Sequence, residues 1–226
     1  MPNLSIPPCF ISSRCELCGV VGNLSSCICD ACIDDLPQVI NQCVRCGMVL
    51  SKNAEVCGSC LNTDWLAYQT ICPFQYHYPL DRLIQKIKYH DGIRLISPLA
   101  NKLALKLDQQ HLPEVMIPVP LHPFRAYNRG FNQSMEICRI LKNQLGIQIF
   151  SDGILRTRNT KPMFDLGSSQ RSINIRGAFR LTKSLSHRSV AIVDDVITSG
   201  ATANELARIL IKAGANKIAF WALARS

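Results

Sequence analysis

Two neighbouring carboxylates, Asp194 and Asp195, stand directly before a turn of small and hydroxyl-bearing residues. The turn consists of Thr198, Ser199, Gly200, Ala201 and Thr202. Backbone N–H groups at a helix start carry partial positive charge, and with these hydroxyls they favour a bound phosphate. The carboxylates can accept hydrogen bonds from ribose hydroxyls or hold a hydrated Mg²⁺. The stretch therefore predicts a site for phosphate, ribose and magnesium; the alternative is a solvated acidic turn before an ordinary helix.

The elements on either side must hold this turn in place. Residues Val190–Val193 form a short β-branched run, which is typical of a strand buried on both faces. After the turn, apolar residues recur at helical spacing, and Gly214 is placed to end the helix. Thr202 and Glu205 have capping-box spacing, so we expect the helix to begin within a residue or two of Thr202. The aspartates then lie at the usual ligand edge of an open α/β sheet, where Gly200 lets the backbone approach a ligand closely.

A second stretch, residues 116–134, predicts the same kind of architecture. An apolar strand ends near Pro120, and a loop that carries Arg125 and Arg129 leads into a helix ending at Gly146. A strand end that feeds a basic loop at a helix start is suited to an anion. We expect this loop to face the pyrophosphate of a ligand whose 5′-phosphate occupies the first turn. The alternative is that both arginines are surface charges.

The remaining elements are read more coarsely. Residues 72–78 alternate in the manner of a strand with an aromatic face, and an amphipathic helix follows from Leu80. A further helix is expected at 99–107. Residues 147–182 read as strand, loop and strand, and the polar, basic connection that includes Arg156 is typical of a mobile lid beside an active cleft.

Eight of the twelve cysteines form four C-x-x-C pairs, with ten residues between one pair and the next. The pairs are Cys15/Cys18, Cys29/Cys32, Cys43/Cys46 and Cys57/Cys60. This spacing predicts two tandem zinc ribbons, each with two knuckles around a tetrahedral Cys₄ zinc. Sequential grouping is the default, an interleaved cross-brace is the alternative, and Cys27 is a spare that can replace Cys29. Cys9, Cys72 and Cys138 are expected to be small buried hydrophobes.

Composition restricts the class of protein. The 226 residues are 47% hydrophobic, and no apolar run approaches the ~20 residues of a membrane span. The N-terminus has no signal-peptide pattern, so we expect a cytoplasmic location, where twelve cysteines point to metal rather than disulfides. Residues 1–75 carry a net charge of −3 and residues 76–226 a net charge of +12. The basic part suits a polyanion, either a pyrophosphate or a nucleic-acid backbone.

Taken together, these patterns resemble the ComF family, which includes the late competence protein ComFC and its relative GntX. The resemblance covers nearly the whole chain and rests on the four cysteine knuckles and on three further motifs. These motifs are PVPLHPFRAYNRGFNQS (118–134), QRSINIRGAF (170–179) and VAIVDDVITSGAT (190–202). It implies a zinc-finger module, residues 1–70, fused to an α/β type I phosphoribosyltransferase-like domain, residues 71–226, with a parallel sheet and flanking helices. It also implies a part in the uptake of single-stranded DNA during natural transformation.

The resemblance assigns roles to individual residues. Asp194 and Asp195 match the pair that contacts the ribose hydroxyls of phosphoribosyl pyrophosphate (PRPP) and its Mg²⁺, and they are the catalytic carboxylates if the domain is a transferase. The turn 198–202 matches the 5′-phosphate loop, with Ser199 where many members have threonine. Arg125 and Arg129 are a looser match to the pyrophosphate contacts. No motif matches a nucleobase-specificity element, so the sequence does not indicate an acceptor.

Three functions are consistent with this reading. The first is a PRPP-binding competence protein that handles single-stranded DNA, the second is an active phosphoribosyltransferase of the glycosyltransferase class with an unknown acceptor, and the third is a non-catalytic PRPP-sensing partner module. DNA binding is predicted because six aromatic residues are interleaved with lysine and arginine. They are Tyr76, Tyr78, Tyr89, Phe124, Tyr127 and Phe131. Expected partners are a competence helicase or an inner-membrane DNA channel; the chain itself is not expected to span the membrane.

Overall fold

The computed structural model describes residues 14–21, 26–51, 54–160 and 168–226. The predictions made for Cys9 and for the N-terminal stretch before residue 14 lie outside these segments. Within the described segments, no helix combines the length and the apolar character needed to cross a bilayer.

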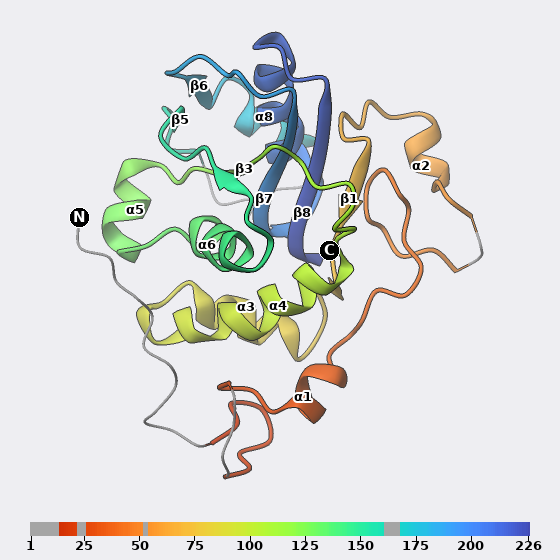
Figure 1. Ribbon diagram of the computed structural model, residues 1–226, viewed down its shortest axis with the longest axis vertical. Helices are drawn as coiled ribbons and strands as arrows, with labels where there is room; N and C mark the ends of the chain where they lie inside the picture. Colours follow the sequence, from red (N-terminus) through yellow and green to blue (C-terminus); the bar gives the residue numbers. More distant parts are fainter. Residues whose placement is uncertain (1–13, 22–25, 52–53, 161–167) are drawn as a thin grey trace.

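A parallel sheet runs through the middle of the molecule (Figure 1). Its strand order is β1-β8-β7-β3-β4, and β2 also pairs with β8, beyond β1. The strands are β1 (Gln69–Ile71), β2 (Phe74–Gln75), β3 (Val115–Pro118), β4 (Gln148–Ile149), β7 (Ser189–Ile197) and β8 (Lys217–Arg225). The pairs that join them are all parallel, so their carboxyl ends meet at one edge. The predicted α/β fold with a parallel sheet and flanking helices is confirmed.

Helices cover both faces of this sheet. Side chains alternate along each strand, so the apolar residues of a strand point to both faces and are buried by the helices on each. Ala191 and Val193 of β7 pack in the cluster that contains α3, α4 and α6, whereas Val190 and Ile192 pack in the cluster that contains α8. The helices are α3 (Leu80–Ile87), α4 (Ile96–Lys106), α6 (Gln133–Leu145) and α8 (Ala201–Lys212). Strand 190–193 is therefore buried on both faces, as the sequence predicted.

The two cysteine-rich segments pack in different places (Figure 1). Cys15, Ile33 and Leu36 belong to the cluster that contains α3 and α4, and α1 (Asp30–Asp34) begins inside the Cys29/Cys32 knuckle. The other segment, with α2 (Gly58–Leu61), joins the cluster on the opposite face of the sheet. The division of the chain at residue 70 stays a prediction.

The basic segment after β3 is a helix, α5 (Pro123–Arg129), where the sequence predicted a loop. The His122 ring caps it, since Nδ1 accepts a hydrogen bond from the backbone N–H of Phe124 at 3.3 Å. Gly130 ends α5 with a φ of 73°, and Asn132 caps α6, which ends at Gly146 as predicted. Histidine is not a usual capping residue, so the start of this helix has only a weak signal in the sequence.

The expected strand, loop and strand between residues 147 and 182 also hides a helix, α7 (Ser168–Ile175). It lies in the chain between β5 (Ile154–Arg156) and β6 (Phe179–Leu181), which form a separate antiparallel pair. The prediction of a loop was wrong because the many polar residues here, read by composition alone, obscured an amphipathic helix. Lys161, in the connection to α7, lies outside the described residues.

Two boundaries also differ from the sequence prediction. In place of the strand expected at 72–78, the chain forms two short strands. β1 ends at Ile71, because Pro73 has no N–H to donate to the ladder, and only Phe74–Gln75 pair again with β8. Helix α4 begins at Ile96 rather than at residue 99, since the 3₁₀ helix η1 (His90–Leu95) runs directly into it. Neither difference moves the sheet edge at which the aspartates lie.

Candidate functional site

A cavity of about 330 Å³ opens at the carboxyl ends of β3, β7 and β8. It brings together every site residue that the sequence predicted in the second part of the chain. Its lining includes Arg125, Arg129, Asp194, Asp195, Thr198, Ser199, Gly200, Ala201 and Thr202. Two segments that lie far apart in the sequence, 125–134 and 194–202, therefore form one site.

The two aspartates occupy the end of β7, which continues to Ile197. Both line the cavity, and one oxygen of Asp194 accepts from the Ser134 hydroxyl at 3.0 Å and from the Asp195 backbone N–H at 2.9 Å. Burial, and then the neighbouring charge of Asp195, raise the pKa of Asp194 well above its usual value. A carboxylate in that position is stabilised in its ionised form by a bound cation, which suits Mg²⁺.

Three arginines line the same cavity: Arg125, Arg129 and Arg156. Arg125 donates to the carbonyl of Thr160, and Arg129 donates to the side chain of Gln133 at 3.2 Å. Burial, together with the charges of Arg125 and Arg129, lowers the pKa of Arg156 to about 10 although Asp194 opposes the shift. Three positive charges around one cavity repel one another, and an anion bound in the cavity would stabilise them.

Arg156 was not predicted as a ligand residue. It is 7% exposed, donates to the Thr160 hydroxyl, and leaves its Nε buried without a hydrogen-bond partner among the described residues. Within the same described segments, the Gln133 amide nitrogen is also unpartnered, and both side chains line the cavity. Unpartnered donors on side chains that line a cavity indicate a place where a ligand can supply an acceptor. The sequence showed Arg156 only as one residue of a basic connection, and no motif around it indicated a contact with a ligand.

The turn 198–202 overlaps the start of α8, whose first residue is Ala201. The predicted start of this helix is confirmed, but the predicted capping box is not, because Glu205 accepts instead from the backbone N–H of Gly177 at 2.7 Å. Gly200, the residue before α8, has no side chain to cap the helix, and the Ser199 hydroxyl accepts from the Ala201 N–H at 3.5 Å. The first turn presents its following N–H groups to a ligand in the cavity.

Gly200 has a further role besides the one that the sequence suggested. Its φ is 72°, and a Cβ at this position would lie 2.1 Å from the ring of Trp65. Glycine is therefore required by the left-handed backbone and by the close approach of Trp65, on the protein side of the loop.

The eight paired cysteines form two groups, Cys15/Cys18/Cys29/Cys32 and Cys43/Cys46/Cys57/Cys60. The grouping is sequential, as expected, and within each group the sulfur atoms lie within 4.8 Å of one another. Sulfurs of adjacent knuckles are 3.8 Å apart in the first group and 3.6 Å apart in the second. Tetrahedral zinc with Zn–S bonds of about 2.3 Å requires an S···S distance of about 3.8 Å, so the thiols fit this metal.

The backbone around each first knuckle also fits a metal–thiolate centre. Gly19 and Gly47 adopt φ values of 72° and 73°, which closes each knuckle so that amide N–H groups point at sulfur. Burial raises the pKa of Cys15, but the hydrogen bonds from the backbone outweigh it and bring the pKa to about 6. A thiol with that pKa is a thiolate at neutral pH, the form that binds zinc.

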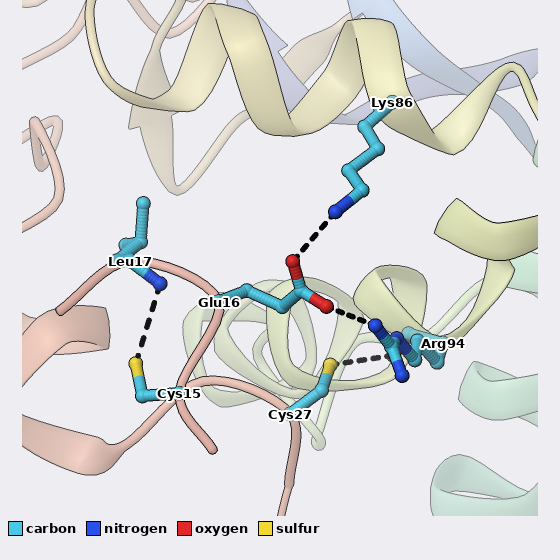
Figure 2. A network of polar contacts seen from close by, with 6 residues as sticks. All are labelled: Cys15, Glu16, Leu17, Cys27, Lys86 and Arg94. Atoms are coloured by element: carbon cyan, nitrogen blue, oxygen red, sulfur yellow. Dashed lines mark hydrogen bonds and ion pairs between the residues drawn. The ribbon is translucent and has the colours of Figure 1, made fainter. Parts of the chain in front are cut away.

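A polar network fixes the first cysteine group to α3 and η1 (Figure 2). Glu16 accepts from Lys86 Nζ at 2.6 Å and pairs through its other oxygen with Arg94. The hydrogen bond from Lys86, despite opposing burial, and the charges of Lys86 and Arg94 lower the pKa of Glu16. The Cys27 thiol donates to the carbonyl of Arg94 at 3.3 Å, so Cys27 does not replace Cys29 in the ligand group.

Cys72 and Cys138 are fully buried, as predicted.

Glu16→Gln should lower the stability of the zinc-loaded protein by about 1–2 kcal/mol, since a mostly buried carboxylate loses two cationic partners. For a chain of this size, that is a fall of about 2–8 °C in the melting temperature. Asp34→Asn is the matched control, because the Asp34–Lys102 pair in the same segment is largely exposed and should contribute little. Equal shifts in the two variants, measured by calorimetric scanning, would contradict the assignment.

No family model matches the chain. Among curated proteins, competence protein F of Haemophilus influenzae is 37% identical over 161 residues, which cover 66% of this chain and 70% of that protein. DNA utilization protein YhgH of Escherichia coli (strain K12) is 35% identical over 154 residues, which cover 66% of this chain and 68% of that protein. Both similarities extend over two thirds of the relative or more.

Similar solved structures include a glutamine PRPP amidotransferase from B. subtilis complexed with ADP and GMP, with a TM-score of 0.40 and 20% identity. The similarity covers 61% of this chain and 30% of that enzyme. A purine phosphoribosyltransferase from Pyrococcus horikoshii has a TM-score of 0.34 and 19% identity, covering 58% of this chain and 83% of that enzyme. The chain thus spans under a third of the first enzyme's length and most of the second.

Proposed function

The chain belongs to the competence protein F family, and on that premise we propose that it binds Mg²⁺–PRPP in the cavity at the sheet edge and handles single-stranded DNA in the cytoplasm. Its two cysteine groups hold structural zinc. The observation that carries the PRPP proposal is one cavity lined by two aspartates, three arginines and the first turn of α8. PRPP offers a matching set of groups: ribose hydroxyls, a pyrophosphate and a 5′-phosphate.

Each part of PRPP has a proposed partner in the cavity. The 5′-phosphate binds at the turn 198–202, where α8 presents its first N–H groups. Asp194 and Asp195 bind the ribose hydroxyls and Mg²⁺, which relieves the unfavourable burial of the Asp194 charge. The pyrophosphate binds the arginine group, because guanidinium ions bind phosphate oxygens through paired N–H donors.

Arg156→Lys should weaken Mg²⁺–PRPP binding by about tenfold or more, because lysine keeps the charge but lacks the guanidinium fork. Arg180→Lys is the matched control. Arg180 lies on β6, the partner strand of β5, is exposed, and does not line the cavity. Calorimetric titration of both variants measures the difference, and a loss of affinity in Arg180→Lys equal to that in Arg156→Lys would contradict the placement.

We further propose that single-stranded DNA binds over α5, beside the mouth of the cavity. Phe124 and Tyr127 on this helix are 60% and 88% exposed, whereas Arg125 and Arg129 line the cavity. Exposed aromatic rings next to guanidinium groups provide stacking faces and phosphate contacts, which together bind single strands with little sequence preference. Of the other aromatic residues named for this role, Tyr78 and Tyr89 are also exposed, while Tyr76 and Phe131 pack against the core.

Tyr127→Ala should weaken binding of a 30-nucleotide oligomer by about fivefold or more, since a stacked base contributes about 1–3 kcal/mol. Tyr68→Ala is the control, because Tyr68 is an exposed tyrosine that precedes β1, at the opposite edge of the sheet from the cavity. Fluorescence anisotropy at several salt concentrations measures both variants. Affinity that ignores salt, or an equal effect of the two substitutions, would contradict DNA binding at α5.

A working phosphoribosyltransferase, with an acceptor still to be found, is the second candidate. The same cavity would hold PRPP in either case, and Asp194 and Asp195 would then be its catalytic carboxylates. Release of pyrophosphate from PRPP in the presence of candidate acceptors distinguishes the two. A competence helicase or an inner-membrane DNA channel is the proposed protein partner.

A further inference from the structure

The segment between Cys60, the last of the paired cysteines, and β1, residues 61–68, packs against the turn 198–202, called the anion-binding turn below. Trp65 is 8% exposed, and its ring lies so close to Gly200 that no Cβ fits between them. The ring is held edge-on against Phe220 of β8, with centroids 5.6 Å apart. One wall of the turn is therefore supplied by the segment that follows the second cysteine group rather than by the sheet.

Two arginines bind backbone carbonyls of this cysteine group: Arg225 connects the group to the turn, and Arg45 connects it to Trp65. Arg225 Nε donates to the carbonyl of Cys46 at 2.8 Å, and its Nη1 donates to the carbonyl of Ile197 at 3.0 Å and to that of Thr198. Arg45 donates through one nitrogen to the carbonyl of Cys60 and through another to that of Trp65, both at 2.7 Å. A single buried guanidinium thus joins a metal-ligand residue to the start of the turn.

A third connection runs from the first turn of α8. The Asn204 side-chain oxygen accepts from the backbone N–H of Leu66 at 3.0 Å, and its amide nitrogen donates to the carbonyl of Asp64. The segment that follows the Cys57/Cys60 knuckle is therefore hydrogen-bonded to helix α8, directly after the turn.

We propose that the second cysteine group sets the conformation of the anion-binding turn, with Arg225, Trp65 and Asn204 as positioning residues; the identity of the ligand rests on the proposed function. The carbonyls of Cys46 and Cys60 are in place only when the knuckles are folded, and such knuckles fold around their metal. Metal at the second site then stabilises the turn in its binding conformation. The first group is tied instead to α3 and η1, through Glu16 and Cys27.

The two groups provide a matched pair of variants, because each second knuckle opens a short helix in the same way. Cys57→Ser/Cys60→Ser removes half of the ligands of the second site, and Cys29→Ser/Cys32→Ser removes half of those of the first. Hydrogen exchange of the amides in residues 197–203 is measured on each full-length variant, after native mass spectrometry has shown the loss of one zinc. We expect exchange at the turn to rise by about tenfold or more in the second-site variant and to stay near wild type in the first-site variant.

Two milder variants test the connections with both metals bound. Arg225→Lys and Asn204→Ala should each increase exchange at the turn, whereas Arg94→Lys, which alters the anchor of the first group, should not. Unchanged exchange in the second-site variants, or an equal increase in the first-site ones, would overturn the inference.

Calorimetry with Mg²⁺–PRPP on the same variants separates this inference from the proposed function. Weaker binding in Arg225→Lys than in Arg94→Lys, alongside faster exchange, supports both. If wild-type protein does not bind Mg²⁺–PRPP, the proposed function fails, and the exchange measurements still decide whether the second cysteine group controls the turn.

Discussion

Removal of zinc by a chelator is expected to unfold both cysteine groups while the parallel sheet and its helices remain folded. The described residues between positions 14 and 61 form short helices of five and four residues and isolated bridges, too little regular structure to fold without metal. Structural zinc contributes about 10–16 kcal/mol to such a module. The sheet has its own core on both faces, formed largely by residues after position 70.

Native mass spectrometry should find two zinc ions per chain before chelation, and hydrogen exchange should then locate the unfolding. We expect rapid exchange throughout residues 14–61 after chelation and continued protection in β3, β7 and β8. A single zinc ion would contradict the assignment of one of the two groups. The absence of zinc, or a sheet that unfolds together with the cysteine groups, would contradict the account of the module as a whole.

Replacing both aspartates by asparagine should have opposite effects on stability and on binding. Burial and then the neighbouring Asp195 raise the pKa of Asp194, so the free protein loses stability as the pH rises from the ordinary pKa of an aspartate to that raised pKa, and the loss stays constant above it. An asparagine in place of Asp194 keeps an oxygen that accepts from the Ser134 hydroxyl and the following backbone N–H. Asp194→Asn/Asp195→Asn should therefore melt at the same temperature as wild type or higher.

The same double variant should lose Mg²⁺–PRPP binding by about a hundredfold or more, because neither amide supplies the charge that holds the cation. In a thermal-shift experiment, Mg²⁺–PRPP should raise the melting temperature of wild type and leave that of the variant unchanged. Asp152→Asn is the control, since Asp152 is exposed and pairs with Lys183 away from the cavity. A ligand-induced shift of equal size in the double variant would contradict the role of the aspartates.

The parts of the site that the sequence predicted are those with local signals. The β-branched run before Asp194, the small-residue turn and the helical spacing after it are all contained within the stretch from Val190 to Gly214, so no tertiary information was needed. The cysteine groups were predictable for the same reason: a C-x-x-C knuckle places two thiols together whatever the fold around it.

The parts that the sequence did not predict reach the site through tertiary packing. Arg156 lines the cavity by way of β5, outside the main sheet, and Trp65 reaches Gly200 from a segment in which the sequence predicted no site residue. Helix α5 was missed because its cap is His122, and α7 because polar residues dominate its sequence. Similarly, the regular spacing of the knuckles does not indicate that the two cysteine groups pack with different faces of the sheet.

The central claim is that the cavity at the sheet edge binds PRPP with magnesium, and a calorimetric titration of the zinc-loaded wild-type protein tests it most directly. With Mg²⁺ present, we predict saturable binding of one PRPP per chain. Without Mg²⁺, or in the Asp194→Asn/Asp195→Asn variant, we predict that this binding is lost. No binding by wild type, or equal affinity in the presence and absence of Mg²⁺, would contradict the claim.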